Sequence, residues 1–169
     1  MGVDIHMYII RGNKMVAENI FDGRNPDWFN NLQGKYSGNE YDTLPVSFGV
    51  PREIPSGLES AAISSIDNCY YGHAYMVVQE FCEWFEKARP DRDAGWVTIR
   101  EKWLIENKGH DPEIYIKPEL DRNDILENMC FIEYKHEYDC SAWLYTYLKN
   151  KMEQGTIKKD DVIFYYFDC

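Results

Sequence analysis

The sequence has no long apolar run, no paired cysteine motif and few basic residues, and each of these absences excludes a class of protein. No stretch of about 18 or more apolar residues occurs, and no basic segment followed by an apolar run opens the chain, so neither membrane insertion nor export is indicated. The five cysteines contain no Cys-x-x-Cys spacing, which favours reduced thiols over a disulfide or zinc framework. We therefore expect a protein of the cytoplasm that has no membrane partner.

Basic residues are scarce relative to acidic ones. The chain has 18 Lys and Arg against 29 Asp and Glu, which leaves a formal net charge of −11. Such a chain repels phosphate backbones, so a nucleic-acid polymer is not an expected partner. The acidity fits simple solubility as well as a basic partner, and charge alone does not separate the two.

Several motifs of known chemistry are also missing. The sequence contains no Gly-x-Ser-x-Gly, Walker-type loop, Gly-x-Gly-x-x-Gly or His-Glu-x-x-His. What it does contain is the composition of a folded protein, because 44% of its 169 residues are hydrophobic and 15% are aromatic. A chain of this length is expected to form one domain over residues 1–169.

The first third of the chain predicts a hairpin, a short helix and a loop. Two β-favouring runs, 3–10 and 15–21, flank a short loop that contains Gly12 and Asn13, as in a hairpin. Pro26 suits the first position of a helix that continues to Leu32. From 35 to 56 the composition shifts to Gly, Ser, Asn and three prolines, which predicts a long irregular loop.

The remainder alternates helical patterns with a final strand. The predicted helices cover 57–66, 74–87, 99–107, 121–129 and 141–153. The helix over 99–107 depends on a capping box from Thr98 to Glu101 and competes with a strand over 96–99. The β-branched and aromatic run 162–167 predicts a last strand. Together these elements predict an α+β fold: a small, mainly antiparallel sheet that includes both terminal strands, is covered by helices and carries the long irregular loop.

The two ends of the chain carry matching polar chemistry. A strand places residues i and i+2 on one face, so Asp4 and His6 share a face, and so do Tyr166 and Asp168. If the terminal strands pair, one small surface holds all four side chains. That surface would be a polar site.

Scattered motifs along the chain carry a family resemblance. They are Met-Gly-Val-Asp-Ile-His at 1–6, Arg-Asn at 24–25 followed by Trp-Phe at 28–29, Pro-Arg-Glu-Ile-Pro at 51–55, and the run 162–168. The chain resembles an uncharacterised family of tailed-bacteriophage and prophage proteins, whose members open Met-Gly-x-Asp-Ile-His and end Phe-x-Phe-Asp-Asn. The resemblance implies a phage-encoded protein that acts in the cytoplasm of the host bacterium, and it implies no activity.

The chain departs from that family at two places. Members often carry His-Ser-x-Ser-Trp before the middle helix, whereas 71–75 here reads Tyr-Gly-His-Ala-Tyr and keeps only the imidazole, at His73. A serine nucleophile at this place is therefore not expected. Cys169 replaces the usual Asn, which removes an amide from the C-terminus.

Our first functional hypothesis is a phage accessory protein that binds a small polar ligand, plausibly of nucleotide type. Arginine grips phosphate and aromatic rings stack on bases, and the candidate residues are Arg24, Trp28, Arg52 and Tyr71. The competing interpretation is that these arginines fasten loops and these rings cover the core. By analogy with its source, such a protein would counteract host defence.

Two alternatives stay open, so whether the protein is an enzyme is undecided. One is a metal-assisted hydrolase with Asp4, His6, His73 and Asp168 as catalytic candidates. Asp4, His6 and Asp168 would be the ligands of a divalent metal. A purely structural His–Asp pair competes with it. The other alternative is an acidic interaction or virion-associated protein whose partner is a host protein.

Overall fold

The computed structural model describes residues 3–33, 44–58, 71–90, 92–108, 129–135 and 140–168. The chain forms two compact units, one of Met1–Arg89 with Cys140–Cys169 and one of Pro90–Asp139. The expectation of a single domain over residues 1–169 stays a prediction. Within the described ranges, no helix combines the length and apolar character needed to cross a membrane.

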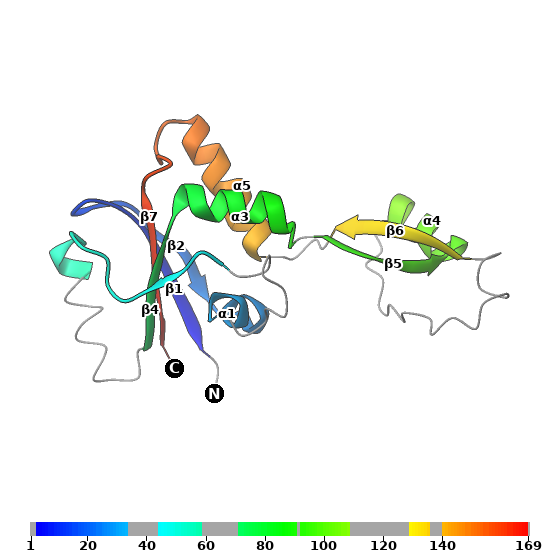
Figure 1. Cartoon of the computed structure of the whole chain (residues 1–169), viewed down its shortest axis with the longest axis horizontal. Coiled ribbons are helices and arrows are strands. Elements are labelled where there is room, and N and C mark those ends of the chain that lie inside the picture. The colour runs from blue at the N-terminus through cyan, green and yellow to red at the C-terminus, as the bar shows by residue number, and fades with distance from the viewer. Residues whose placement is uncertain are drawn as a thin grey trace. The chain divides into compact units, whose positions relative to one another are not determined.

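The first unit is built on a five-stranded antiparallel sheet in the order β2-β1-β7-β4-β3. Its strands are β1 Asp4–Arg11, β2 Lys14–Gly23, β3 Ser47–Phe48, β4 Tyr71–Val77 and β7 Val162–Asp168. The terminal strands β1 and β7 pair along their lengths, and the N and C ends therefore lie together in Figure 1. The predicted α+β fold with both terminal strands in one antiparallel sheet is confirmed.

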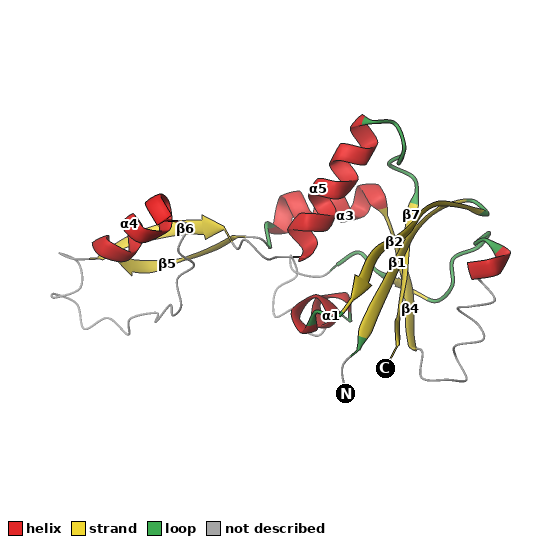
Figure 2. Cartoon of the chain, turned by 180° about the vertical axis from the view of Figure 1, so that it is seen from behind, coloured by secondary structure: helices red, strands yellow, loops and turns green. Residues whose placement is uncertain are grey.

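Three labelled helices belong to the described part of this unit, and Figure 2 shows them in red beside the yellow sheet, together with a short unlabelled helical turn that begins at Ser56. They are α1 Pro26–Leu32, α3 Val78–Ala88 and α5 Cys140–Glu153. α1 begins as its sequence predicts, because Pro26 needs no backbone partner there and Asn25 Oδ1 accepts a hydrogen bond from Trp28 N at 2.8 Å.

The predicted helix start at residue 74 is wrong, because residues 74–77 belong to a strand. Residues 74–77 end β4, where Ala74 lies opposite Tyr165 and Val77 opposite Val162, so α3 begins only at Val78. The apolar pattern of 74–87 covers both elements, and pairing with β7 decides where the strand stops. Glu80 then caps the helix by accepting a hydrogen bond from Val77 N at 3.2 Å.

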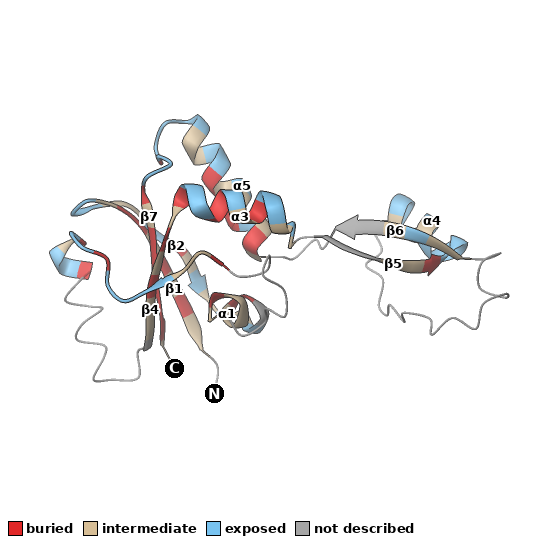
Figure 3. Cartoon of the chain, in the orientation of Figure 1, coloured by how far each residue is buried: buried red, intermediate tan, exposed pale blue. Residues whose placement is uncertain are grey.

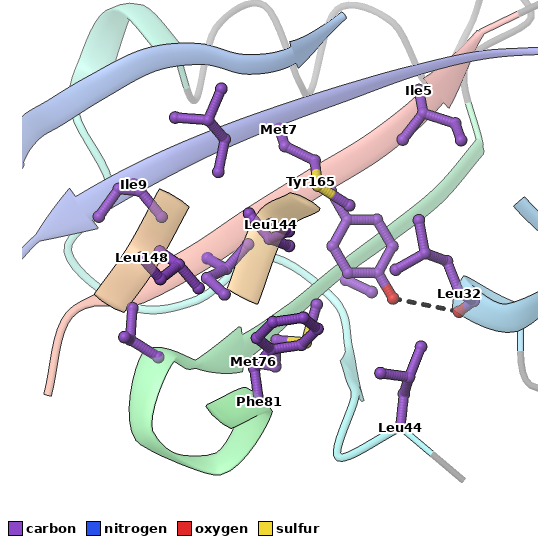
Figure 4. Packing of buried hydrophobic residues seen from close by; sticks show 14 of the residues in the cluster. Ile5, Met7, Ile9, Leu32, Leu44, Met76, Phe81, Leu144, Leu148 and Tyr165 are labelled. Atoms are coloured by element: carbon purple, nitrogen blue, oxygen red, sulfur yellow. Dashed lines mark hydrogen bonds between the residues drawn. The ribbon is translucent and has the colours of Figure 1, made fainter. Parts of the chain in front are cut away.

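The core lies between the sheet and its helices (Figure 3). Alternate residues Ile5, Met7 and Ile9 of β1 are 0% exposed and pack with α1, α3 and α5. Figure 4 shows this packing, including the Tyr165 hydroxyl that donates a hydrogen bond to Leu32 O at 3.1 Å. On the opposite face a smaller cluster joins Ile54 of the loop to Phe164. The polar residues of β1 and β7 belong to this second face.

The second unit contains β5 Arg92–Thr98, α4 Ile99–Lys108 and β6 Met129–Lys135, with β5 and β6 antiparallel. The competing predictions over 96–107 are both partly right, because the strand ends at Thr98 and the helix starts at Ile99. The capping box is present: Glu101 N donates to Thr98 Oγ1 at 3.2 Å and Thr98 N donates to Glu101 Oε2 at 2.9 Å.

Some predicted elements fall outside the described residues. Of the helix expected over 57–66, only 57–58 are described, and they are helical. Of the helix expected over 121–129, only Met129 is described, and it begins β6 instead. Residues 35–43 of the expected long loop lie outside the description, while 44–58 contain the short β3 and otherwise mainly loop.

Candidate functional site

The pairing of the terminal strands brings the predicted polar residues together. Asp4 lies directly opposite Asp168, and His6 lies directly opposite Tyr166. Because alternate residues share a face, all four belong to the face that turns away from the main core, whose own residues are Ile5 and Phe167 and their neighbours. The juxtaposition expected from the sequence is therefore present.

His6 lies between two carboxylates. Its Nδ1 is 3.1 Å from Asp22 Oδ1, and its Nε2 is 3.1 Å from Asp168 Oδ2. Asp22 comes from β2, where the hairpin register sets it opposite His6. The contact of Nε2 with Asp168 is a hydrogen bond, and Nδ1 lies at ion-pair distance from Asp22. Both ring nitrogens thus lie beside carboxylates of the protein itself.

Asp4 is held by an arginine that directly follows β2. Arg24 Nε donates to Asp4 Oδ1 at 2.5 Å and Arg24 Nη2 donates to Asp4 Oδ2 at 3.3 Å, a bidentate pair. The hydrogen bond from Arg24 lowers the pKa of Asp4 below its usual value, and the same bond raises the pKa of Arg24. The Arg24 side chain is nevertheless 60% exposed, so its guanidinium is fixed and accessible at once.

Aromatic and imidazole rings form a row beside these charges. Tyr166 stacks on His6 at a centroid distance of 5.1 Å and on His73 at 5.8 Å, with interplanar angles of 27° and 29°. Tyr8 stacks on Tyr166 at 6.0 Å, and their hydroxyls lie 3.3 Å apart. His73 Nε2 is buried and has no hydrogen-bond partner in the described structure. We call these four residues the ring row.

We call the charged group beside it the polar face: Asp4, His6, Asp22, Arg24 and Asp168. Three carboxylates outnumber one guanidinium here, so the polar face favours ligand groups that donate hydrogen bonds. Among the described residues, no three His, Cys, Asp or Glu side chains are grouped so that they could hold a metal ion. Of the expected ligands, Asp4 is paired with Arg24, and His6 is paired with Asp168, so they are not among such a group.

The other residues expected to bind a ligand are dispersed. Trp28 is 2% exposed and packs edge-on against Phe81 in the main core, away from the polar face. Arg52 is exposed in the turn after Pro51, in the loop that packs on the opposite end of β1. Tyr71 pairs through its backbone with Phe167, and its side chain lies outside the described atoms. Of the four residues, Arg24 is the one that the described structure places beside the ring row.

Sequence reasoning missed Asp22 and Tyr8. Tyr8 follows from period-2 alternation, because it continues the Asp4 and His6 face of β1. Asp22 does not follow from it, because the register at the Gly12 and Asn13 turn, if continued without irregularity, would set Asn19 opposite His6. The register irregularities between Met7 and Ile10 make the position of Asp22 dependent on the folded hairpin.

A scan of known protein families, a search of curated proteins and a search of solved structures each found no match to this chain.

Proposed function

We propose that this protein binds a small polar ligand, of nucleotide type, at the polar face. The observation that carries the proposal is the exposed guanidinium of Arg24, which Asp4 fixes next to the stacked rings of His6 and Tyr166. A fixed cation and a row of rings are the two elements that recognise a phosphate and a base.

Each group of the polar face has a suitable counterpart on such a ligand. Asp4 takes Nε and Nη2 of Arg24, so the remaining N–H groups of the guanidinium can donate to a phosphate. Carboxylates such as Asp22, whose side chain is 54% exposed, accept hydrogen bonds from the amino groups of a base. The local excess of carboxylates favours amino-bearing bases and ligands with few phosphates.

Binding is better supported than hydrolysis. A metal-assisted hydrolase needs ligands converging on one point, and a general base needs a free ring nitrogen. In the described residues, both nitrogens of His6 lie beside carboxylates, the unpaired Nε2 of His73 is buried away from solvent, and no metal-binding group is assembled. We therefore place the polar face in recognition and assign no catalytic residue.

The biological setting of this proposal rests on the family resemblance alone. A phage-encoded binder acting in the host cytoplasm would remove a nucleotide signal and so counteract host defence.

A second candidate is an interaction protein whose partner is a host protein. Large apolar side chains are exposed on the second unit, where Ile99, Trp103 and Phe131 are 62%, 52% and 61% exposed. The test is cross-linking in host lysate: a specific host protein cross-linked to the natural chain should be lost when Trp103→Ser and Phe131→Ser are combined. Unchanged cross-linking would remove these side chains from the interface.

The ligand proposal is tested first by native mass spectrometry of gently purified protein, compared with its denatured mass. A panel of mononucleotides and cyclic nucleotides is then titrated by calorimetry into the natural chain and into Arg24→Gln. We expect one nucleotide to bind and the variant to bind it at least about tenfold more weakly. Arg100→Gln, an exposed arginine of α4, is the matched control and should leave affinity unchanged. No saturable binding at millimolar concentration, or equal affinity in Arg24→Gln, would overturn the proposal.

A further inference from the structure

A polar pocket lies at the other end of β1 from the polar face. It has a volume of about 640 Å³ and is lined by Arg11, Gly12, Asn13, Lys14 and Glu53. Four of these residues form the end of β1, the hairpin turn and the start of β2, and Glu53 reaches it from the loop at 44–58. The pocket is open to solvent, and its size is sufficient to receive part of a small metabolite.

Arg11 is fixed in the wall of this pocket. The Asp161 carboxylate, whose side chain is 0% exposed, accepts hydrogen bonds from Arg11 Nε at 2.6 Å and Arg11 Nη2 at 2.8 Å. Lys158 N donates to the same carboxylate at 2.8 Å, and Arg11 Nη2 also donates to Thr156 O at 3.2 Å. These bonds leave Arg11 Nη1 as a pre-positioned donor.

Glu53 is held from the opposite side. Its φ of 62° is left-handed, a conformation that costs a residue with a side chain free energy and persists only where the surroundings impose it. Buried Ile54 follows it and packs with Ile10 and Phe164 of the sheet. A Cβ built on Gly12 would lie 3.8 Å from Glu53 Oε2, so the carboxylate stands beside the hairpin turn.

Opposite charges therefore line one pocket without neutralising each other. In the described structure, Lys14 and Glu53 form no ion pair with each other or with any other residue. Lys14 and Arg11 Nη1 can receive an anionic group, and Glu53 can receive an ammonium group. We propose that this pocket binds a small zwitterion, such as a short peptide or an amino-acid-type metabolite with separated charges.

The residues in the wall argue against a second nucleotide site. None of the pocket's five lining residues is aromatic, so the wall offers no ring for a base to stack on. Asp4 and His6 lie at the beginning of β1, and Arg24 binds Asp4 there, whereas the pocket lies at the end of β1. The pocket is thus separate from the polar face of the proposed nucleotide site.

The ligand class is tested with three matched probes in solution NMR of the full chain. Triglycine carries both charges, N-acetyl-triglycine carries only the anion and triglycinamide carries only the cation. We expect saturable shifts of the amide signals of Gly12, Asn13 and Glu53 with triglycine, and at least about tenfold weaker binding of either single-charge probe. No saturable shift, or equal affinity for all three probes, would overturn the proposal.

Variants locate the two charge contacts. Lys14→Gln and Glu53→Gln change exposed side chains and each should weaken triglycine binding about tenfold while leaving the fold intact. Arg52→Gln is the control, since it is the exposed neighbour of Glu53 and does not line the pocket. If Arg52→Gln lost as much triglycine affinity, the effect would come from the overall charge of the surface, and the proposed site would be overturned. Arg24→Gln should leave triglycine binding unchanged, which separates this proposal from the nucleotide proposal.

Discussion

Replacing Tyr165 by Phe isolates one buried hydrogen bond that joins the sheet to α1. Tyr165 is 0% exposed in the middle of β7, and its hydroxyl donates to Leu32 O at 3.1 Å (Figure 4). Leu32 is the last residue of α1, so its carbonyl is one of those that the helix itself leaves without a partner. Phe keeps the ring and its edge contact with Phe167, at a centroid distance of 5.6 Å, and removes only the oxygen.

The expected loss follows from the two ends of that bond. A hydrogen bond contributes about 1 kcal/mol net to stability, and a buried carbonyl that loses its partner costs about 1–3 kcal/mol. The two figures are alternative estimates of the stability lost in Tyr165→Phe. We expect the free energy of unfolding to fall by about 2 kcal/mol. For a chain of this length that lowers Tm by about 4–8 °C.

Urea denaturation with an unchanged m-value measures this loss. The matched control is Tyr147→Phe on α5, whose ring stacks on Trp143 near the surface at 5.5 Å and keeps that contact as Phe. The control should change stability by less than about 0.5 kcal/mol. A Tyr165→Phe loss no larger than the control's would refute the assignment of a stabilising bond to Leu32.

Alkaline pH gives the same residue a second test. Burial raises the pKa of Tyr165 well above its ordinary value of 10.0. The folded phenol stays neutral while the unfolded one ionises, so its contribution is fully present below pH 10 and is lost as pH rises further. The natural chain should lose up to about 1.4 kcal/mol per pH unit above pH 10 more than Tyr165→Phe does. If the stability of the two proteins fell in parallel above pH 10, Tyr165 would not be a buried neutral phenol.

Three further predictions concern other parts of the first unit. Gly72→Ala should destabilise by about 2–4 kcal/mol in urea, because its φ is +68° and a Cβ there would lie 2.4 Å from Phe167 Cδ2; a loss below about 1 kcal/mol would mean that the ring moves aside. Burial raises the pKa of the Cys82 thiol to about 11, so alkylation at pH 8, followed by peptide mass spectrometry, should be about 100-fold slower in the folded than in the unfolded chain, and similar rates would refute it. Arg24 lowers the pKa of Asp4, so the stabilising effect of the Asp4 carboxylate is present above the ordinary pKa of 3.8 and is lost as pH falls through the folded pKa. NMR titration should show that Arg24→Gln raises the pKa of Asp4, and an unmoved midpoint would contradict the pairing.

The structure also places the candidate functional residues in different surroundings. His6 and Asp168 meet as the strand pattern predicts, but Asp22 takes the second nitrogen of the imidazole. Trp28 has the ring that a base would need, yet its apolar surface is worth more in the core than at a pocket rim. In the proposed function, recognition at this face consequently depends on Arg24 and the ring row.

Local patterns determined much of this protein by themselves. Period-2 alternation put Asp4 with His6 and Tyr166 with Asp168, because successive side chains of a strand must point to opposite faces. The hairpin, α1 and the capping box at Thr98 are likewise predictable from the sequence, because turn and cap residues form hydrogen bonds with near neighbours in the chain.

Tertiary structure alone decided what these local pieces meet. Strand order is set by contacts between residues far apart in the chain, and only it places β7 between β1 and β4 and brings Tyr166 between His6 and His73. The boundary between β4 and α3 was decided by pairing with β7, since the apolar pattern fits both a strand and a helix. The bond between Arg11 and Asp161 joins residues 150 positions apart, and no local preference encodes that separation.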